Sequence, residues 1–157
     1  MGSSAWRTGS KFAGLDDISL IYPSYDTYLD INVPSRNLIK SGNFYDIMFE
    51  TNYIKKGFQE NSYCVYPYFQ NGLVMFKNEE AQNEEAPVDK KILLTSDSFG
   101  MTLAPYLALQ TKNMNFFFGA NINLKAYSKD FNPDIIIMLY YPPSIASYIN
   151  SLSAQFE

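Results

Sequence analysis

The serine at position 98 has a reactive side chain and stands where reactive groups often gather. It lies in TSDSFG, residues 95–100, between the apolar run KKILLTS and a helix-type pattern, FGMTLAPYLALQTK. A serine hydroxyl there could attack an ester, because the N-terminal amides of a helix stabilise negative charge that develops on oxygen. Ser and Asp are also preferred N-cap residues, and helix capping is the interpretation that physics alone favours.

Nucleophilic chemistry at Ser98 would need a general base, and the chain contains no histidine. A neutral hydroxyl is a poor nucleophile without one. Lys112 and Lys125 are the lysines nearest in sequence, but both have the pattern of exposed helix charges. Cys64 is the one cysteine, and we expect a buried structural thiol there rather than a nucleophile. The chain alone is therefore expected to be nearly inactive.

The residues around Ser98 follow an alternating pattern of strands and helices. We predict buried strands in KKILLTS, MNFFFG and DIIIMLYY. We predict helices in FGMTLAPYLALQTK, NLKAYSKDF and PPSIASYINSLSAQF. Pro105 is expected to kink the first of these helices. This order predicts a parallel sheet with helices on its faces. Functional groups gather at the carboxyl ends of parallel strands, where TSDSFG, GANIN and YYPPS would meet.

The first half of the chain, residues 15–77, is mostly of β type. Strand patterns occur twice in residues 18–33, around Pro23 and Asp26, and again in 43–50, 61–69 and 72–78. The segment SGNFYDIMFETNYIKKG, residues 41–57, could instead hold a short helix. The chain has 13 Tyr and 12 Phe, which suits large packed side chains and, as an alternative, a sugar-binding surface.

Composition excludes some classes of function. The net charge of -4 and the lack of a Lys/Arg-rich stripe argue against nucleic-acid binding. The composition of residues 77–91 indicates a solvated acidic loop. The weaker alternative is a carboxylate cluster that binds a metal ion. No apolar stretch is long enough to span a membrane. The start resembles an expression-vector leader, so we expect residues 1–14 to be leader residues, and missing targeting signals then say nothing about compartment.

The block ILLTSDSFGMTLAPYL resembles the first block of SGNH hydrolases, a turn in which Asp-Ser carries the nucleophile. Together with residues 18–49, with SYCVYPYFQNGLVMFKN and with NFFFGANINLKAYSKDFNPDIIIMLYY, it resembles the DHHW-type, alginate O-acetyltransferase-like branch of these proteins. The resemblance covers roughly residues 15–150. It implies an α/β fold with a Rossmann-like (flavodoxin-like, SGNH-type) parallel sheet flanked by helices, and an additional β-rich N-terminal half. Residues 15–157 would form one such domain, with an upstream part missing.

The resemblance also implies a chemistry, O-acetyl transfer or acetyl-ester hydrolysis on cell-surface or secreted polysaccharide. Ser98 would be the nucleophile and Asp97 its neighbour in the motif. The amide of Ser98, with that of Gly119, would face the oxyanion, although Gly119 also fits a plain turn glycine. Neither cofactor nor metal is implied. The protein would act outside the cytoplasm, on a carbohydrate or acyl-ester substrate, alongside other polysaccharide-assembly proteins.

The sequence departs from ordinary SGNH enzymes at two places. LYYPPS stands where their GxND block would be, and SIASYINSLSAQFE stands where they carry DxxH. The DHHW-type branch places its Asp and His upstream of the serine block, and those residues would precede this chain. An alternative is a non-catalytic carbohydrate-binding or assembly module of the same fold, with Tyr140 and Tyr141 stacking on sugar rings. A weaker one is nucleotide or flavin binding, for which TSDSFG is a poor phosphate loop.

Overall fold

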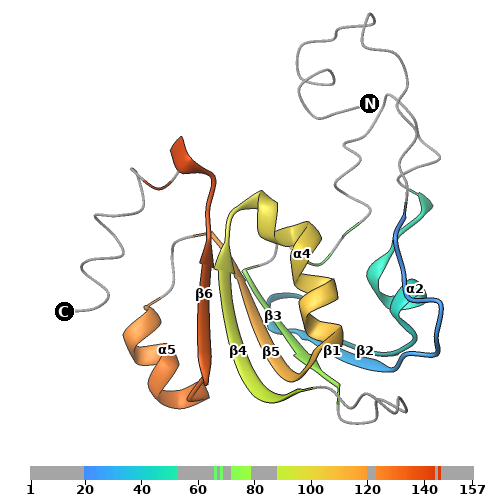
Figure 1. The fold of residues 1–157 in the computed structure, drawn as a ribbon, viewed down its shortest axis with the longest axis horizontal. Helices are drawn as coiled ribbons and strands as arrows, with labels where there is room; N and C mark the ends of the chain where they lie inside the picture. Colours follow the sequence, from blue (N-terminus) through green and yellow to red (C-terminus); the bar gives the residue numbers. More distant parts are fainter. Residues whose placement is uncertain are drawn as a thin grey trace, which may run out of the picture.

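The computed structural model describes residues 20–52, 66, 68, 72–78, 88–119, 123–143 and 145. Its elements, in chain order, are β1 (Leu29–Val33), the 3-10 turn η2 (Pro34–Arg36), β2 (Leu38–Gly42), α2 (Phe44–Met48), β3 (Leu73–Lys77), β4 (Val88–Ser96), α4 (Ser98–Leu109), β5 (Thr111–Phe118), α5 (Leu124–Phe131) and β6 (Ile135–Leu139). Figure 1 shows one curved sheet with α4 packed in front of it. The expected leader residues 1–14, Cys64 and residues 146–157 lie outside the described part.

The six strands of the described residues form one mixed sheet, in the order β2-β1-β3-β5-β4-β6. The pairs β4–β5 and β4–β6 are parallel, and the three remaining pairs are antiparallel. The parallel sheet predicted from the second half is therefore confined to β5, β4 and β6. The β-rich first half adds its strands to the same sheet in antiparallel fashion. The finer assignment, a Rossmann-like SGNH sheet, stays a prediction.

The two connecting helices cover opposite faces of the parallel strands. Helix α4 buries Met101 and Ala104 in the cluster that contains Leu94 of β4, whereas α5 buries Leu124 against Leu93. Successive residues of a strand point to opposite faces, so Leu93 and Leu94 place the helices on different sides. The predicted strand–helix–strand–helix–strand order of residues 88–139 is confirmed, and α4 runs on through Pro105.

Two segments of the first half that were predicted as strands are not strands among the described residues. In residues 43–50 the chain forms helix α2 (Phe44–Met48) instead, and Asn43 caps it: the Asn43 side-chain oxygen accepts a hydrogen bond from the amide of Asp46 at 3.0 Å. The two strands predicted around Pro23 and Asp26 reduce to β1 alone. The segment before β1 is held by a side-chain hydrogen bond and not by strand pairing: the hydroxyl of Tyr106 donates to the carbonyl of Ile21 at 2.8 Å.

Burial corrects one further expectation, because β6 is not a buried strand. Ile135, Ile136 and Met138 are 44%, 41% and 48% exposed. Strand β6 has β4 on one side only, and it forms an edge of the sheet among the described residues. The apolar run was a correct signal for a strand, but burial also depends on neighbours that the run does not specify.

Several phenylalanines form part of the core, whereas most of the described tyrosines do not. Phe44, Phe76 and Phe116 are among the largest fully buried side chains, and Phe44 contacts the rings of Phe49 and Tyr106. Packing was the preferred interpretation of the aromatic content, and it holds for these Phe side chains. It does not hold for the exposed tyrosines Tyr22, Tyr25, Tyr28, Tyr45 and Tyr141. The acidic run 77–91 is bounded by strands, with Lys77 ending β3 and Val88 beginning β4. No helix of the described residues is long and apolar enough to cross a membrane.

Low pH is expected to destabilise the start of β6, because Asp134 then loses its negative charge. The amide of Lys91 donates to Oδ2 of Asp134 at 2.8 Å, and this hydrogen bond, helped by the charge of Lys90, lowers the pKa of the carboxyl. A lowered pKa in the folded state means that the stabilisation is complete above the ordinary pKa of about 4 and is lost as pH falls through the lowered value.

Asp134→Asn should therefore destabilise the protein at pH 7, and the difference from wild type should shrink as the pH is lowered below about 4. Urea unfolding at several pH values measures it, with Asp89→Asn as a control for the loss of one nearby surface carboxylate. A difference between wild type and Asp134→Asn that stayed constant with pH would contradict the assignment.

Candidate functional site

The site predicted at Ser98 is built on the carboxyl end of β4, the central strand of the three parallel ones. Asp97 follows β4 and is the N-cap of α4: its Oδ1 accepts from the amide of Phe99 at 3.0 Å. Its Oδ2 accepts from the amide of Tyr141 at 2.7 Å. One carboxylate therefore ties the start of α4 to the chain that leaves β6. The N-cap of α4 is therefore Asp97, and the capping role considered for Ser98 does not apply.

Ser96 fixes the same turn from inside the sheet. Its buried hydroxyl accepts a hydrogen bond from the amide of Gly100 at 2.9 Å and donates to the carbonyl of Leu139 at 2.5 Å. The first turn of α4 can approach this closely because residue 100 has no side chain. A Cβ there would lie 2.3 Å from both Cβ and Oγ of Ser96. Ser96 and Gly100 thus set the position at which Ser98 leaves the sheet.

Ser98 is the first residue of α4 and is exposed. Among the described residues neither its hydroxyl nor its amide has a hydrogen-bond partner, whereas the next two amides are taken by Asp97 and Ser96. The free amide at a helix N-terminus is a donor that can face a negatively charged oxygen. The structure therefore presents the hydroxyl and a potential oxyanion donor at one residue.

Gly119 directly follows β5 and lies next to this turn, as the sequence predicted. Its amide donates to the carbonyl of Ser96 at 2.8 Å, and its carbonyl accepts from the hydroxyl of Tyr140 at 3.3 Å. Its φ of 91° is one that residues other than glycine rarely adopt, which fits the turn-glycine interpretation. Because the amide hydrogen is already bonded to Ser96, the arrangement leaves it no free hydrogen for an oxyanion.

Tyr140 and Tyr141 border the site from the β6 side. The Tyr140 hydroxyl reaches from the end of β6 to Gly119 at the end of β5, across the end of β4. The Tyr141 ring is 49% exposed and stacks on Phe99, with centroids 5.6 Å apart and planes at 23°. No pattern in the sequence indicated the contribution of Phe99. All five predicted site residues thus come to one edge of the sheet.

No base for Ser98 is present among the described residues. Lys112 lies at the start of β5, the opposite end of that strand from Gly119, and its ammonium is 3.5 Å from Asp89. An eight-residue strand spans roughly 25 Å, which is too far for a lysine to bridge. Lys125 makes no hydrogen bond with the Ser98 hydroxyl. The described residues hold no group of His, Cys, Asp and Glu side chains that could bind a metal ion.

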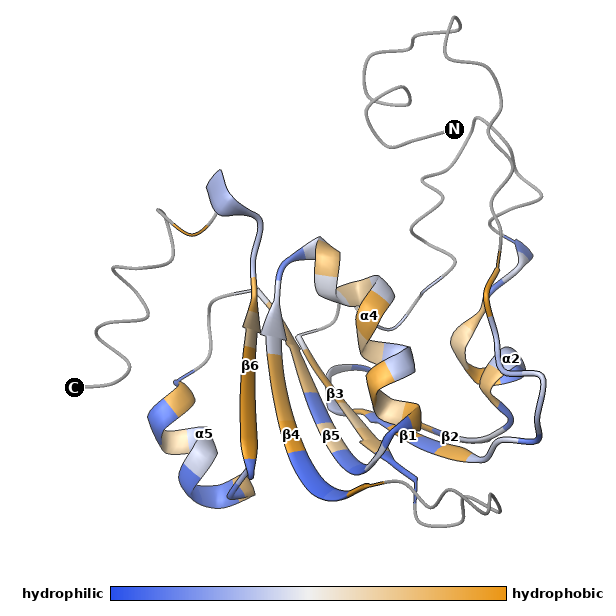
Figure 2. Ribbon diagram, in the orientation of Figure 1, coloured by the Kyte–Doolittle hydropathy of each residue, from blue (hydrophilic) through white to orange (hydrophobic). Residues whose placement is uncertain are grey.

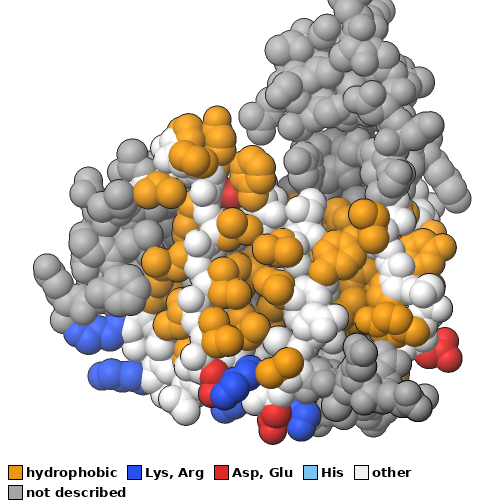
Figure 3. Space-filling view, viewed as in Figure 1, with side chains coloured by type: hydrophobic (Ala, Val, Ile, Leu, Met, Phe, Trp, Pro, Cys, Tyr) orange, Lys and Arg blue, Asp and Glu red, His pale blue; other side chains and the backbone are white. Residues whose placement is uncertain are grey.

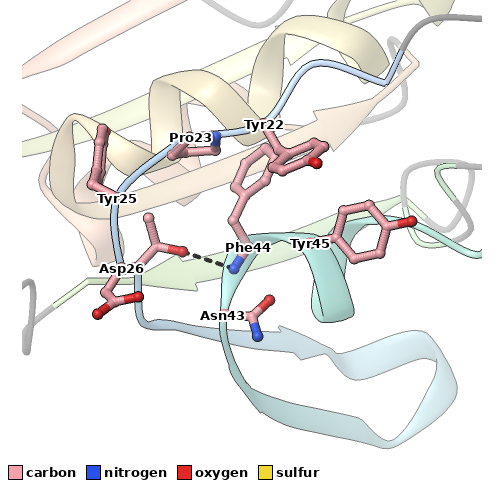
Figure 4. Close-up of a pocket in the computed structure, with 8 residues that line it drawn as sticks. Tyr22, Pro23, Tyr25, Asp26, Asn43, Phe44 and Tyr45 are labelled. Atoms are coloured by element: carbon pink, nitrogen blue, oxygen red, sulfur yellow. Dashed lines mark hydrogen bonds between the residues drawn. The ribbon is translucent and has the colours of Figure 1, made fainter.

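A pocket lies away from this edge, beside α2. It has a volume of about 150 Å³ and is lined by Tyr22, Pro23, Tyr25, Asp26, Thr27, Asn43, Phe44 and Tyr45. The Thr27 hydroxyl accepts a hydrogen bond from the amide of Phe44 at 2.9 Å. The rings of Tyr22 and Tyr45, labelled in Figure 4, meet edge to face with their centroids 5.1 Å apart. Pockets for drug-sized ligands usually exceed about 300 Å³, so this hollow is a small one.

Comparison with known proteins gives likenesses of fold alone. No family model matches the chain, and no curated protein matches it. Among solved structures it is similar to Bacillus cereus PatB1 carrying a sulfonyl adduct (17% identity, TM-score 0.49, 74% of this chain and 37% of that one). It is also similar to a second PatB1 structure (18%, 0.49, 74% and 35%) and to a DHHW family protein from Eubacterium siraeum (12%, 0.47, 75% and 36%). The chain spans little more than a third of these proteins.

Asp97→Ala is expected to weaken both ties that the carboxylate makes. Loss of an N-cap alone costs about 1 kcal/mol, and loss of the bond to the Tyr141 amide adds to it. Asp97→Asn should restore much of the cap, since Asn is as good an N-cap as Asp. Urea unfolding of both variants measures this, with Asn43→Ala at the cap of α2 for comparison. Equal stability of wild type and Asp97→Ala would contradict the role given to Asp97.

Proposed function

We propose that the chain is the serine-bearing part of an enzyme of SGNH type that transfers or hydrolyses acyl esters of cell-surface or secreted polysaccharide. The observation that carries the proposal is the state of Ser98. Its hydroxyl is exposed and unpartnered among the described residues, and its amide is the free one in the first turn of α4. Helix capping explains Asp97, and it leaves Ser98 unexplained.

In the proposed reaction the Oγ of Ser98 attacks the acyl carbon of an ester. A base takes the hydroxyl proton, and the carbonyl oxygen becomes an oxyanion that the Ser98 amide and the helix N-terminus stabilise. The oxyanion collapses, the bond to the alcohol breaks, and the base returns the proton to the leaving alkoxide. The acyl-serine ester is then resolved by a sugar hydroxyl, which completes a transfer, or by water, which completes hydrolysis.

The base must come from outside this chain, because the chain has no histidine. We propose an Asp–His pair carried by a segment of a longer protein, in the upstream position that the resemblance implies. Phe99 and Tyr141 would form the wall against which a sugar ring lies, since an exposed aromatic face suits such a ring. On this proposal the protein works outside the cytoplasm.

A second candidate is a non-catalytic carbohydrate-binding or assembly module with the same fold. One observation favours it: the carboxylate of Asp97 is bonded through both oxygens to backbone amides, so it holds structure together rather than reaching toward a substrate. Such a module would use the Tyr141 and Phe99 surface without any turnover.

The deciding experiment measures hydrolysis of a chromogenic acetate by this chain and by the longest natural protein that contains it. The proposal predicts background activity for the chain alone and measurable activity for the longer protein, because only the latter supplies the base. Background activity from both, with the longer protein shown to be folded by circular dichroism and to bind acetylated polysaccharide, would favour the binding module.

A further inference from the structure

Phe99 and Tyr141 form a pair of exposed aromatic rings beside Ser98. Phe99 follows Ser98 in the first turn of α4, and Tyr141 lies just beyond the end of β6. Their rings stack with centroids 5.6 Å apart, although the two residues are 56% and 49% exposed. Figure 3 shows hydrophobic side chains gathered at the upper ends of α4 and β6, whereas the Lys and Arg side chains of this view lie along the lower edge. We call Phe99 and Tyr141 together the aromatic platform.

One carboxylate holds both residues of the aromatic platform by their backbones. Asp97 accepts from the amide of Phe99 through Oδ1 at 3.0 Å and from the amide of Tyr141 through Oδ2 at 2.7 Å. Figure 2 shows this turn between β4 and α4 as a hydrophilic link beside the hydrophobic strand β6. A carboxylate can receive two N–H donors at once because both of its oxygens are acceptors. The alignment of the two rings therefore depends on Asp97.

Tyr141 lies beyond the part of the chain that the sheet holds. The last pair of β4 with β6 is Ser96 with Leu139, and the Ser96 hydroxyl also donates to the Leu139 carbonyl at 2.5 Å. The amide of Tyr141 follows this pair and is bonded to Asp97. Of the hydrogen bonds among the described residues, this is the one that joins residue 141 to the start of α4. Asp97 thus sets where the Tyr141 backbone lies relative to Phe99.

We propose that Asp97 is a positioning residue whose carboxylate aligns the aromatic platform, and that the platform selects esters of sugar rings over esters of small open-chain alcohols. The inference rests on the acyl-ester chemistry proposed for Ser98. The C–H faces of a pyranose ring are apolar, so they lie favourably against an exposed aromatic ring. A sugar held there brings its ester group to the Ser98 hydroxyl in a fixed orientation, which lowers the barrier for attack.

Replacing Asp97 by Asn separates the two bonds of the carboxylate. An Asn side chain has one acceptor oxygen, and its other group is a donor NH₂. The bond to Phe99 spans two positions in the chain and the bond to Tyr141 spans 44, so keeping the first costs less chain entropy. Asn is also as good an N-cap as Asp. Asp97→Asn should therefore keep the start of α4 in place and release Tyr141, because its NH₂ would then meet the Tyr141 amide donor to donor.

NMR on this chain tests the positioning without any catalysis. Wild type should show nuclear Overhauser effects between the rings of Phe99 and Tyr141, and Asp97→Asn should lose them. Effects between Gly100 and the ring of Phe116, which a close approach of α4 to the sheet produces, should persist in both proteins. Asn43→Asp exchanges the same residue types at the cap of α2 and should keep the ring contacts of the platform. Unchanged ring contacts in folded Asp97→Asn would overturn the proposal.

Specificity in the longer protein that supplies a base tests what the aromatic platform does. Acetate release from an O-acetylated methyl glucoside is compared with acetate release from ethyl acetate, as the ratio of the two kcat/KM values. Asp97→Asn and Tyr141→Ala should each lower this ratio about tenfold or more. The double variant should lower it no further than Tyr141→Ala alone, because Asp97 acts through Tyr141. Asn43→Asp should leave the ratio unchanged, even where it changes stability.

The outcomes distinguish this inference from the chemistry on which it rests. A ratio that Asp97→Asn leaves unchanged, or a double variant with a clearly lower ratio than Tyr141→Ala, would overturn the role of Asp97. A ratio that Tyr141→Ala leaves unchanged would remove the platform from substrate selection. A longer protein that hydrolyses neither ester would contradict the chemistry proposed for Ser98 and with it the selection of esters, whereas the NMR comparison decides the positioning of Tyr141 on its own.

Discussion

Ser98→Ala should abolish acetyl-ester hydrolysis in the longer protein that supplies a base. Removing the nucleophile of a serine hydrolase costs about 10⁴-fold or more in kcat, because the acyl-enzyme route is lost and only positioning and oxyanion contacts remain. Stability should change little, since Ser98 is exposed, makes no hydrogen bond among the described residues and is not the N-cap of α4. Steady-state hydrolysis and urea unfolding of the same preparations separate the two effects.

Two matched variants serve as controls for Ser98→Ala, one a turn further along α4 and one at Ser98 itself. Thr102→Ala removes a hydroxyl from the same helix that donates to the carbonyl of Phe99. This variant should retain most of the activity. Ser98→Cys keeps a nucleophile of different reactivity and should retain more activity than Ser98→Ala. Full activity in folded Ser98→Ala would remove Ser98 from the mechanism and leave the binding module as the better account.

Gly100→Ala should cause the largest loss of stability of any single methyl addition at the site. The new Cβ would lie 2.3 Å from Cβ and Oγ of Ser96 and 3.1 Å from a ring carbon of Phe116. Ser96 is the last residue of β4 and is fully buried. It cannot move aside without breaking its hydrogen bonds to Gly100 and Leu139. Overpacking of this kind costs about 3 kcal/mol.

A double-mutant cycle shows whether the clash with Ser96 is the cause. Ser96→Gly removes the side chain that the new Cβ would meet, so Gly100→Ala should cost much less in that background, with a coupling energy of about 1 kcal/mol or more. Leu103→Ala, at an exposed position of the same helix, serves as a control for changes in α4. A Gly100→Ala protein as stable as wild type would show that α4 does not approach β4 as described.

Much of the framework around the site could be predicted from the sequence. Residues 88–139 contain apolar strand runs and helix caps that agree locally, and the structure confirms their order. The meeting of Ser98, Gly119 and Tyr140 at one edge follows from parallel strands ending together. The roles of the individual polar atoms could not be predicted, because the bonds from Asp97 to Tyr141 and from Ser96 to Leu139 join residues more than forty positions apart.

The first half was harder because its strands pair over long distances in the chain. Strand β3 lies between β1 and β5 through pairs such as Asp30–Lys77 and Met75–Asn115, and local patterns carry no information on such partners. The helix α2 was open to prediction, since Asn43 followed by Asp46 is an N-cap signal within an apolar pattern. The exposure of β6 could not be predicted, because an apolar run does not specify whether the strand has a neighbour on both sides.

The most direct test of the account is to look for an acyl group on Ser98 itself. This chain is incubated with a chromogenic acetate and with free imidazole, which replaces the missing base, and acetylated residues are mapped by mass spectrometry in wild type and Ser98→Ala. We expect acetylation of Ser98 that increases with imidazole and clearly exceeds that of Ser24, an exposed serine whose hydroxyl has no hydrogen-bond partner among the described residues. Acetylation of Ser98 no faster than that of Ser24, at any imidazole concentration, would contradict its role as the nucleophile.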